Sequence, residues 1–406
     1  MLINNNDYQK NSNLSRIFEA IWRKPGISRV DISRSLHLYR STTSNIIDEL
    51  LANNIIYEGN AGESSSAGGR RPVCLFPNKL FGCYIGIELE PEYYHLTAVD
   101  ITGKPLQSVT GPIPVNEKLL PDPEQSFIWT IDSIMQQSAE ALNTVTTPIL
   151  GICMGLPGII DIKKRIILKS NPFSLVNFDY GTVFENRYNL PFFMENDANC
   201  CAWLQTAAPG AVQTALTILT KNYGNENKLN YPGNYTNSTG IGIAITLEGK
   251  IQYGKNYSAG EYISQSWRAG SKGQTGLPEA VLTTILKNED SYVAWVRDFF
   301  STLTTFIPLI SPDKVYLHGQ PDNKHEFLKQ TVKSEVPQFY AAVEKMDSEF
   351  VIMKEDVYEV AKGAALMMIQ KMFIIPSFEG VASKDFINWN SCFALQKENK
   401  PLKIQK

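Results

Sequence analysis

The sequence predicts an α/β fold in which a small helical module precedes a larger body built of two similar halves. Three observations predict it. Apolar residues recur at helical spacing over residues 14–53, strand and helix patterns alternate from about residue 82 to 373, and within that second region three strands followed by helices occur twice. A duplicated α/β body of this kind has a cleft between its two lobes.

The composition is globular, with an uneven distribution of charge. Of the 406 residues, 43% are hydrophobic and 19% are charged, and the length allows two or three domains. The net charge is −3, but the first 80 residues hold ten Lys/Arg and seven Asp/Glu, which makes them +3 and the remainder −6. A basic module on an acidic body favours nucleic acid at one end of the molecule.

Targeting signals and cysteine usage favour the cytoplasm. The polar N-terminus lacks a signal-peptide core, and no apolar run reaches the ~18 residues of a membrane span. The six cysteines form no CxxC pair, and none lies between Cys201 and Cys392. We therefore expect buried free thiols rather than disulfides or a zinc site.

Three helices are predicted in the N-terminal module, over residues 14–23, 29–36 and about 40–53. Ser28 is the expected N-cap of the second helix, with Asp31 three residues on. The third helix buries one apolar face, and its other face presents Arg40, Ser41, Thr42, Ser44 and Asn45. This is the layout of a helix-turn-helix, whose second helix reaches base edges in the major groove with such side chains.

A wing is predicted after the third helix. Residues 55–59 and 73–77 have strand patterns, and the Gly/Ser-rich loop between them ends in Arg70 and Arg71. Arginines on such a loop suit the narrow minor groove of DNA. The alternative is a three-helix bundle with a polar surface and a solvated loop.

The whole pattern resembles the ROK family, which contains sugar-responsive repressors and sugar kinases. The module string "GISRVDISRSLHLYRSTTSNIIDELLANNIIYEG…GGRRP" is followed by "GLPG", "ENDAN", "TGIGIAI" and "AGE" in the family's order, over about residues 14–372. The resemblance implies an actin-like, ribonuclease-H-like duplicated fold, a sugar between the lobes, and dimers or higher oligomers. The expected domains are a winged helix-turn-helix at 1–80, a ROK-like domain at 81–373 (lobe one about 81–196 plus the 356–373 helix, lobe two about 197–355) and a tail of unknown role at 374–406.

The resemblance also implies the sugar site. Asp197 takes the place of the catalytic base of the family's kinases, and Asn196, Glu261 and Glu279 match sugar-binding positions. Asn171 is a further expected contact. The alternative is that Asp197 only caps a helix beginning near Ala198 and that both glutamates are solvated.

The nucleotide site of the family's kinases looks degraded in this sequence. Where they have an Asp-x-Gly-Gly-Thr type loop, "GIELEPEYY" places Glu88, Glu90, Pro91 and Glu92. The carboxylates would repel a triphosphate by about 1 kcal/mol or more per pair, and proline has no N–H to offer it. Gly240 and Gly242 of the second phosphate segment survive, behind a polar insertion at 221–237. Kinase activity is therefore not expected.

The resemblance also implies that the family's zinc loop has lost its ligands in this sequence. Ser264 replaces a histidine, Gly270, Lys272 and Leu277 stand at cysteine positions, and residues 202–317 contain neither Cys nor His. No cofactor is therefore expected.

The sequence predicts a DNA-binding transcriptional regulator, a repressor of carbohydrate-metabolism genes. Its expected partners are a double-stranded operator, a small sugar effector and a second copy of the chain, with no membrane. Two alternatives stay open: an active ROK sugar kinase, and a constitutive DNA-binding protein whose ligand-free body only dimerises.

Overall fold

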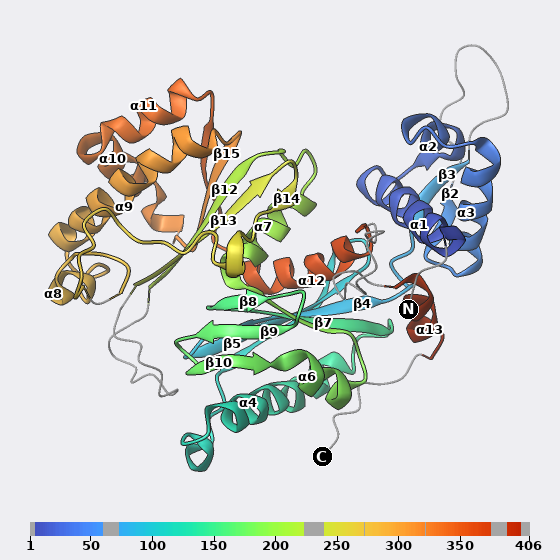
Figure 1. Cartoon of the computed structure of the whole chain (residues 1–406), viewed down its shortest axis with the longest axis horizontal. Coiled ribbons are helices and arrows are strands. Elements are labelled where there is room, and N and C mark those ends of the chain that lie inside the picture. Colours follow the sequence, from blue (N-terminus) through green and yellow to red (C-terminus); the bar gives the residue numbers. More distant parts are fainter. Residues whose placement is uncertain are drawn as a thin grey trace.

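A computed structural model describes residues 5–59, 73–222, 239–271, 273–320, 322–374 and 388–398. The small N-terminal module sits to one side of a larger body with two lobes (Figure 1). Several positions singled out in the sequence lie outside the described residues: Arg70, Arg71, Lys272, most of the 221–237 insertion and most of the 374–406 tail.

The N-terminal module contains the three predicted helices, α1 (Asn5–Arg23), α2 (Arg29–Ser35) and α3 (Arg40–Ala52). Three strands pair in the order β1 (Ile27–Ser28), β3 (Cys74–Pro77) and β2 (Ile56–Gly59). The predicted cap is confirmed, since Ser28 Oγ accepts a hydrogen bond from the Asp31 backbone N–H at 3.2 Å. Strand β1 was not predicted because two residues are too few to display an alternating pattern.

Lobe one is a five-stranded sheet in the order β11-β7-β4-β5-β6, flanked by a smaller sheet in the order β10-β9-β8. Strands β4, β7 and β11 are parallel, so their carboxyl ends meet at one end of the sheet. The bounds are β4 Cys83–Leu89, β5 Tyr93–Asp100, β6 Pro105–Pro112, α4 Pro123–Gln137, α5 Ala139–Leu142, β7 Ile149–Leu156, β8 Ile159–Asp161, β9 Ile166–Ser170, β10 Leu175–Asp179, α6 Tyr180–Tyr188 and β11 Phe192–Asn196.

Lobe two is a second five-stranded sheet, in the order β14-β13-β12-β15-β16. The bounds are β12 Ala215–Asn222, β13 Thr239–Leu247, β14 Lys250–Ile251, α8 Glu279–Leu282, α9 Glu289–Ile310, β15 Lys314–His318, α10 His325–Glu335, α11 Pro337–Lys345 and β16 Glu349–Ile352. Helix α9 is long and apolar enough to span a membrane by composition, but its apolar face is buried with the sheet in the core of lobe two. It is therefore a core helix. Helix α8 consists of a single turn.

Two helices occupy the junction between the lobes: α7 (Asp197–Ala207) and α12 (Glu359–Lys371). They approach so closely that a Cβ atom on Gly363 would lie 1.9 Å from the Cys200 carbonyl oxygen, which explains why glycine occupies this position. Side chains tie the helices further, because Gln370 donates to the Trp203 carbonyl at 2.9 Å and accepts from Thr206 Oγ1 at 3.1 Å. The pair therefore forms one packed unit against both sheets.

The N-terminal module is joined to lobe one by a continuous hydrophobic core. Helix α13 (Trp389–Glu398), in the tail for which the sequence suggested no role, packs on α1: the Trp389 ring lies edge-on to Phe18 at 5.5 Å, and its Nε1 donates to Ser15 Oγ at 3.0 Å. Arg23 of α1 also donates to the Thr206 carbonyl of α7 at 3.2 Å. The module is thus packed onto the body in the described structure, not only tethered to it.

Candidate functional site

A cavity of about 350 Å³ lies between the lobes, where the sequence predicted a cleft. Its volume is in the range of small-molecule sites, about 300–1,000 Å³. The carboxyl ends of β7 and β11 form one wall, and the facing ends of β12 and β13 form the other. The lining residues are Pro157, Gly158, Ile159, Lys169, Asn171, Pro172, Asn196, Asp197, Leu219, Lys221, Thr239, Gly240, Ile241, Gly242, Glu261, Gly273 and Gln274.

Asp197 lines the cavity as the first residue of α7 and is only 8% exposed. Its Oδ1 accepts the Ala198 backbone N–H at 2.9 Å. Burial raises the pKa of the Asp197 carboxyl above its ordinary 3.8, while the nearby Lys221 ammonium opposes the rise. The helix N-terminus and Lys221 both favour a negative charge at this position.

The N-cap of α7 is Asn196, one residue earlier than the alternative interpretation of Asp197 required. Asn196 Oδ1 accepts the Asn199 N–H at 3.2 Å, and its Nδ2 donates to the Gly158 carbonyl at 3.1 Å. Asn196 borders the cavity, but its side chain is already engaged by the protein. Asn196 therefore shapes the wall of the cavity through its contacts with Asn199 and Gly158.

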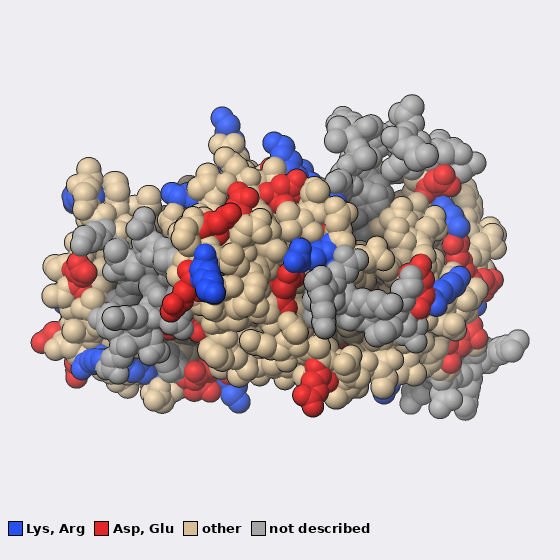
Figure 2. All heavy atoms as spheres, turned by 90° about the horizontal axis from the view of Figure 1, so that it is seen from below, with Lys and Arg blue, Asp and Glu red and all other residues tan. Residues whose placement is uncertain are grey.

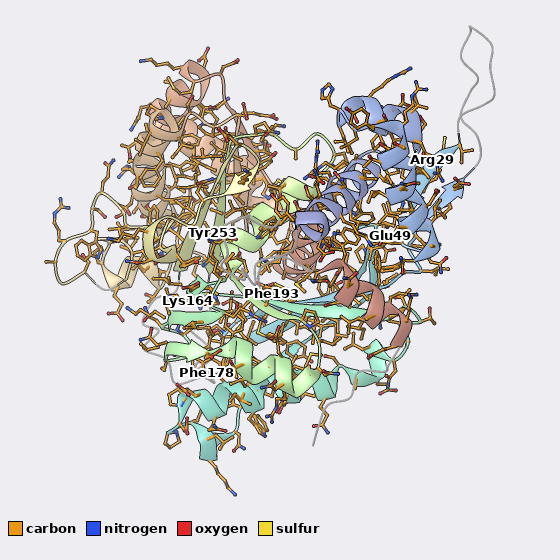
Figure 3. The ribbon with its side chains drawn as sticks, turned by 45° about the vertical axis from the view of Figure 1, so that its right-hand side comes forward. Arg29, Glu49, Lys164, Phe178, Phe193 and Tyr253 are labelled. Carbon is orange, nitrogen blue, oxygen red and sulfur yellow. The ribbon has the colours of Figure 1, made fainter. Side chains whose placement is uncertain are left out.

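Glu195, near the end of β11, is completely buried, and its carboxylate holds neighbouring groups in position. Its carboxylate accepts from Tyr253 Oη at 2.7 Å, from Asn199 Nδ2 at 3.0 Å and from the Asn196 N–H at 2.8 Å. Burial raises the pKa of Glu195, and these hydrogen bonds oppose the rise. Tyr253, labelled in Figure 3, follows β14 of lobe two, so this carboxylate joins the two lobes.

Of the three remaining predicted sugar ligands, two line the cavity and one does not. Glu261 and Asn171 line the cavity from opposite lobes. Glu279 is not among the lining residues: it is exposed at the start of α8, beyond the loop that closes the cavity. Desolvation and the charge of Asp197 raise the pKa of Glu261, which is consistent with two carboxyl groups facing one small space.

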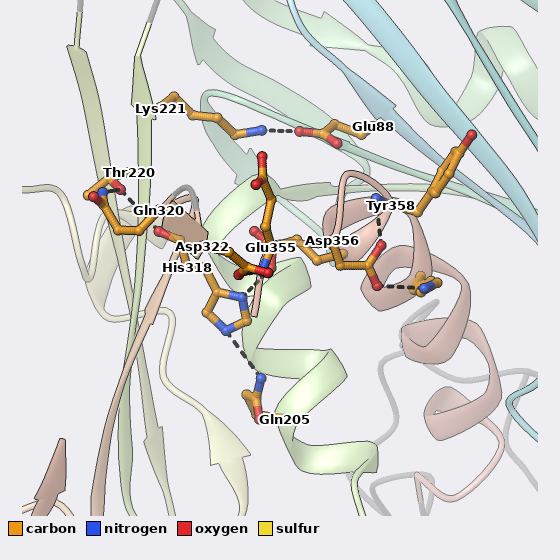
Figure 4. A network of polar contacts seen from close by, with 12 residues as sticks. Glu88, Gln205, Thr220, Lys221, His318, Gln320, Asp322, Glu355, Asp356 and Tyr358 are labelled. Carbon is orange, nitrogen blue, oxygen red and sulfur yellow. Dashed lines mark hydrogen bonds and ion pairs between the residues drawn. The ribbon is translucent and has the colours of Figure 1, made fainter. Parts of the chain in front are cut away.

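Lys221, which the sequence analysis did not single out as a site residue, provides the counter-charge for the carboxylates of β4. Its Nζ forms an ion pair with Glu88 and lies 3.4 Å from Glu90 Oε1 and 3.3 Å from Tyr93 Oη. Figure 4 shows Lys221 and Glu88 approaching each other from opposite lobes. Although burial alone would lower it, Glu88 and Glu90 raise the pKa of Lys221 well above its ordinary value, so the ammonium stays charged. The sequence feature that could have identified Lys221 is a lysine at the end of an otherwise buried strand.

The cluster occupies the edge of the lobe-one sheet where the resemblance implied a phosphate loop. Two of the three carboxylates expected there, those of Glu88 and Glu90, are compensated by Lys221, which corrects the expectation that they would meet a phosphate unpaired. Glu88 is 2% exposed and pairs with a cation from the opposite lobe.

The segment around Gln274 that resembles the family's zinc loop is held in place by hydrogen bonds. Gln274 accepts from the Ile241 N–H at 2.8 Å and donates to the Ile241 carbonyl at 2.6 Å, which fixes the loop beside the glycines of β13. Ser264, at the former histidine position, has its hydroxyl 2.8 Å from that of Ser266. These contacts hold the segment in place beside β13.

Helix α3 presents the predicted DNA-facing side chains. Arg40, Ser41 and Asn45 are exposed, and Thr42 and Ser44 are partly buried. The N-cap residue Tyr39 makes no side-chain cap, so the first N–H groups of α3 are available to a phosphate. Tyr39 itself is 84% exposed. It was not among the residues predicted to face DNA, because a lone tyrosine in a turn carries no periodic signal. On the face of the molecule shown in Figure 2, acidic and basic side chains are interspersed.

Comparisons with known proteins agree with this architecture. The ROK family model matches residues 84–262, and the model "Winged helix-turn-helix DNA-binding" matches residues 10–57. Relatives include a "Putative xylose repressor" of Caldicellulosiruptor sp. (31% identity, 48% of this chain and 47% of the relative) and the "Xylose repressor" proteins of Caldicellulosiruptor bescii (26%, 72% and 71%) and Bacillus subtilis (28%, 63% and 60%). The chain thus spans about half to 71% of the length of these relatives.

Solved structures show the same fold. A ROK family transcriptional regulator, described as a homologue of the E. coli MLC protein, superposes with a TM-score of 0.66 at 17% identity, over 96% of this chain and 99% of that one. A ROK hexokinase from Thermus thermophilus superposes with a TM-score of 0.50 at 17% identity, over 70% and 97%. The chain therefore contains a ROK family domain, matched over residues 84–262, which is preceded by a winged helix-turn-helix domain matched over residues 10–57.

Proposed function

We propose that this chain is a transcriptional repressor that binds operator DNA as a dimer and releases it when a sugar occupies the cavity between the lobes. One observation carries the proposal: the DNA-binding module shares a hydrophobic core with the body that holds the cavity. Because the module and the body are packed together, binding of an operator to one and of a small ligand to the other can influence each other. A cytoplasmic location follows from this role.

Helix α7 supports a route between the two sites. Its first residue, Asp197, borders the cavity, and the carbonyl of Thr206 near its other end accepts from Arg23 of α1. A helix of 11 residues is about 16 Å long and moves as a rod. A sugar that shifts α7 would reorient the DNA-binding module and change the spacing of the two modules in a dimer. About 1–3 kcal/mol of coupling is enough for such a switch.

A neutral sugar is the effector class we propose. Asp197, Glu261 and Asn171 offer acceptors and a donor to hydroxyl groups, and the charge of Lys221 is already balanced by Glu88 and Glu90. Xylose heads the panel to be tested, because the curated relatives are named xylose repressors. The experiment is fluorescence anisotropy with a labelled promoter fragment: a member of the panel should release the protein, and release by none would sink the sensor proposal.

We propose that the protein is not a kinase. The Lys221–Glu88–Glu90 cluster joins the lobes at the place implied for the nucleotide phosphates, and the cross-lobe salt bridge would have to break for a triphosphate to enter. The alternative of an active kinase is tested by measuring ADP formation with ATP and the same sugars, for which we expect no sugar-dependent signal.

Replacing Arg40 tests the DNA interface. A base-reading arginine contributes about 1–3 kcal/mol, so Arg40→Ala should weaken operator binding about 10-fold to 100-fold and affect unrelated DNA much less. The matched control is Arg297→Ala, an exposed arginine on α9 of lobe two. Equal operator affinity of the two variants would mean that α3 is not the reading helix.

The pH dependence of sugar binding tests the role of Asp197. An ionised carboxylate accepts more hydrogen bonds from hydroxyl groups than a protonated one. Because burial raises the Asp197 pKa above 3.8, sugar affinity should fall as the pH is lowered from neutral through this raised pKa, where the carboxylate becomes protonated. Calorimetry across this range should give a flatter profile for Asp197→Asn, with a residual slope from Glu261, whose pKa is also raised. Superimposable profiles would rule out this role.

A further inference from the structure

Three side chains of types that can bind a metal converge at the junction of the lobes, in a place the sequence did not indicate. Cys201 comes from α7, His318 ends β15 of lobe two, and Glu359 begins α12. Every pair of their ligand atoms lies within 4.8 Å. Cys201 and His318 are fully buried and Glu359 is 8% exposed.

The separations are close to those of a coordination sphere. Bond lengths of about 2.0–2.3 Å to zinc place tetrahedral ligands about 3.3–3.8 Å apart, so side-chain adjustments of about 1 Å would suffice. His318 Nδ1 and Glu359 Oε2 are already 2.6 Å apart, and Gln205, one turn beyond Cys201 on α7, has its amide 3.2 Å from His318 Nε2. Figure 4 shows Gln205 on α7 facing His318.

The donor set identifies the class of ion. A thiolate, an imidazole and a carboxylate together suit zinc, whereas magnesium and calcium prefer oxygen donors alone. Three protein ligands leave the fourth position for a water molecule. This cluster is separate from the family's zinc loop, which in this chain spans residues 264–277.

We propose that Cys201, His318 and Glu359 bind one zinc ion that joins α7, α12 and lobe two. Binding sends the Cys201 thiol proton to solvent. Coordination through His318 Nδ1 leaves the imidazole proton on Nε2, where the Gln205 oxygen accepts it once the amide has rotated. Because its ligands come from three elements at the lobe junction, the ion holds the lobes in one relative orientation. The binding test does not depend on the proposed repressor function.

The experiment uses the full-length chain and two neighbouring cysteines. Protein from cells grown in zinc-supplemented medium is dialysed against a weak chelator, and its zinc is measured by mass spectrometry. We expect about one zinc per chain in the wild type and in Cys200→Ser, and less than about 0.1 in Cys201→Ser. Cys200 is the matched control, because it is equally buried on the same helix and lies outside the cluster.

Cobalt reports the ligands directly. Protein refolded with Co²⁺ under reducing conditions should show tetrahedral visible bands and a thiolate-to-cobalt charge-transfer band, retained in Cys200→Ser and lost in Cys201→Ser. Gln205→Ala should weaken binding about 10-fold to 100-fold while leaving the charge-transfer band in place. Circular dichroism identifies any variant that fails to fold, and the wild-type result stands without the variants. Metal-free wild type in both experiments, or equal zinc in the two cysteine variants, overturns the proposal.

Discussion

Lys221→Met is expected to lower the free energy of unfolding by about 3–5 kcal/mol, because it removes the counter-charge of a buried carboxylate. Glu88 is 2% exposed and pairs with the Lys221 ammonium across the lobes. Methionine keeps the length and much of the volume of lysine, so lost packing contributes little. Guanidinium denaturation followed by tryptophan fluorescence measures the change.

Two controls separate the buried ion pair from a general effect of the substitution. Lys329→Met removes an exposed partner of Glu326 and should change stability by less than about 1 kcal/mol. Adding Glu88→Gln and Glu90→Gln to Lys221→Met should restore most of the loss, because the carboxylates are then neutral. A Lys221 variant as stable as the Lys329 variant would show that the cluster does not hold the lobes together.

Asp197→Asn is expected to weaken sugar binding about 10-fold to 150-fold while operator binding without sugar is unchanged. Hydrogen bonds to a charged group are each worth about 1.5–3 kcal/mol, and the amide keeps the shape of the side chain but not its charge. The repressor should therefore stay on its operator at sugar concentrations that release the wild type. Titrating sugar into the protein–operator complex and following anisotropy measures this shift.

Glu279→Gln is the matched control for that experiment. The resemblance implied a sugar contact for Glu279, but this residue is exposed at the start of α8 and does not line the cavity. Its variant should respond to sugar like the wild type. If Glu279→Gln shifts the response as far as Asp197→Asn, the ligand lies elsewhere than the cavity.

Most of the fold could be predicted because its strongest patterns are local. The three helices of the module, the strands of both sheets that carry long apolar runs, and the helix near 356–373 all follow from apolar periodicity within one segment. Strands β8 to β10 were missed, since short strands beside turns have weak alternation. Helix α13 was missed because its packing on α1 depends on residues about 370 positions apart.

The candidate site was predictable only where a contiguous motif carries it. Asp197 and Glu261 lie in such segments and line the cavity. Lys221, His318 and Glu359 act through partners from other elements, and single charged residues at strand or helix ends gave no indication of those partners. Glu279 was carried over from a family position, and the structure places it exposed at the start of α8, outside the lining of the cavity.

The most direct test of the account combines both sites in one titration. Purified full-length protein is bound to its labelled promoter fragment, xylose and other sugars are added in the presence of ATP, and anisotropy and ADP are followed together. We expect specific retention of the fragment, its release by at least one sugar, and no sugar-dependent ADP. A fragment that is never retained, or ADP formed in step with added sugar, would contradict it.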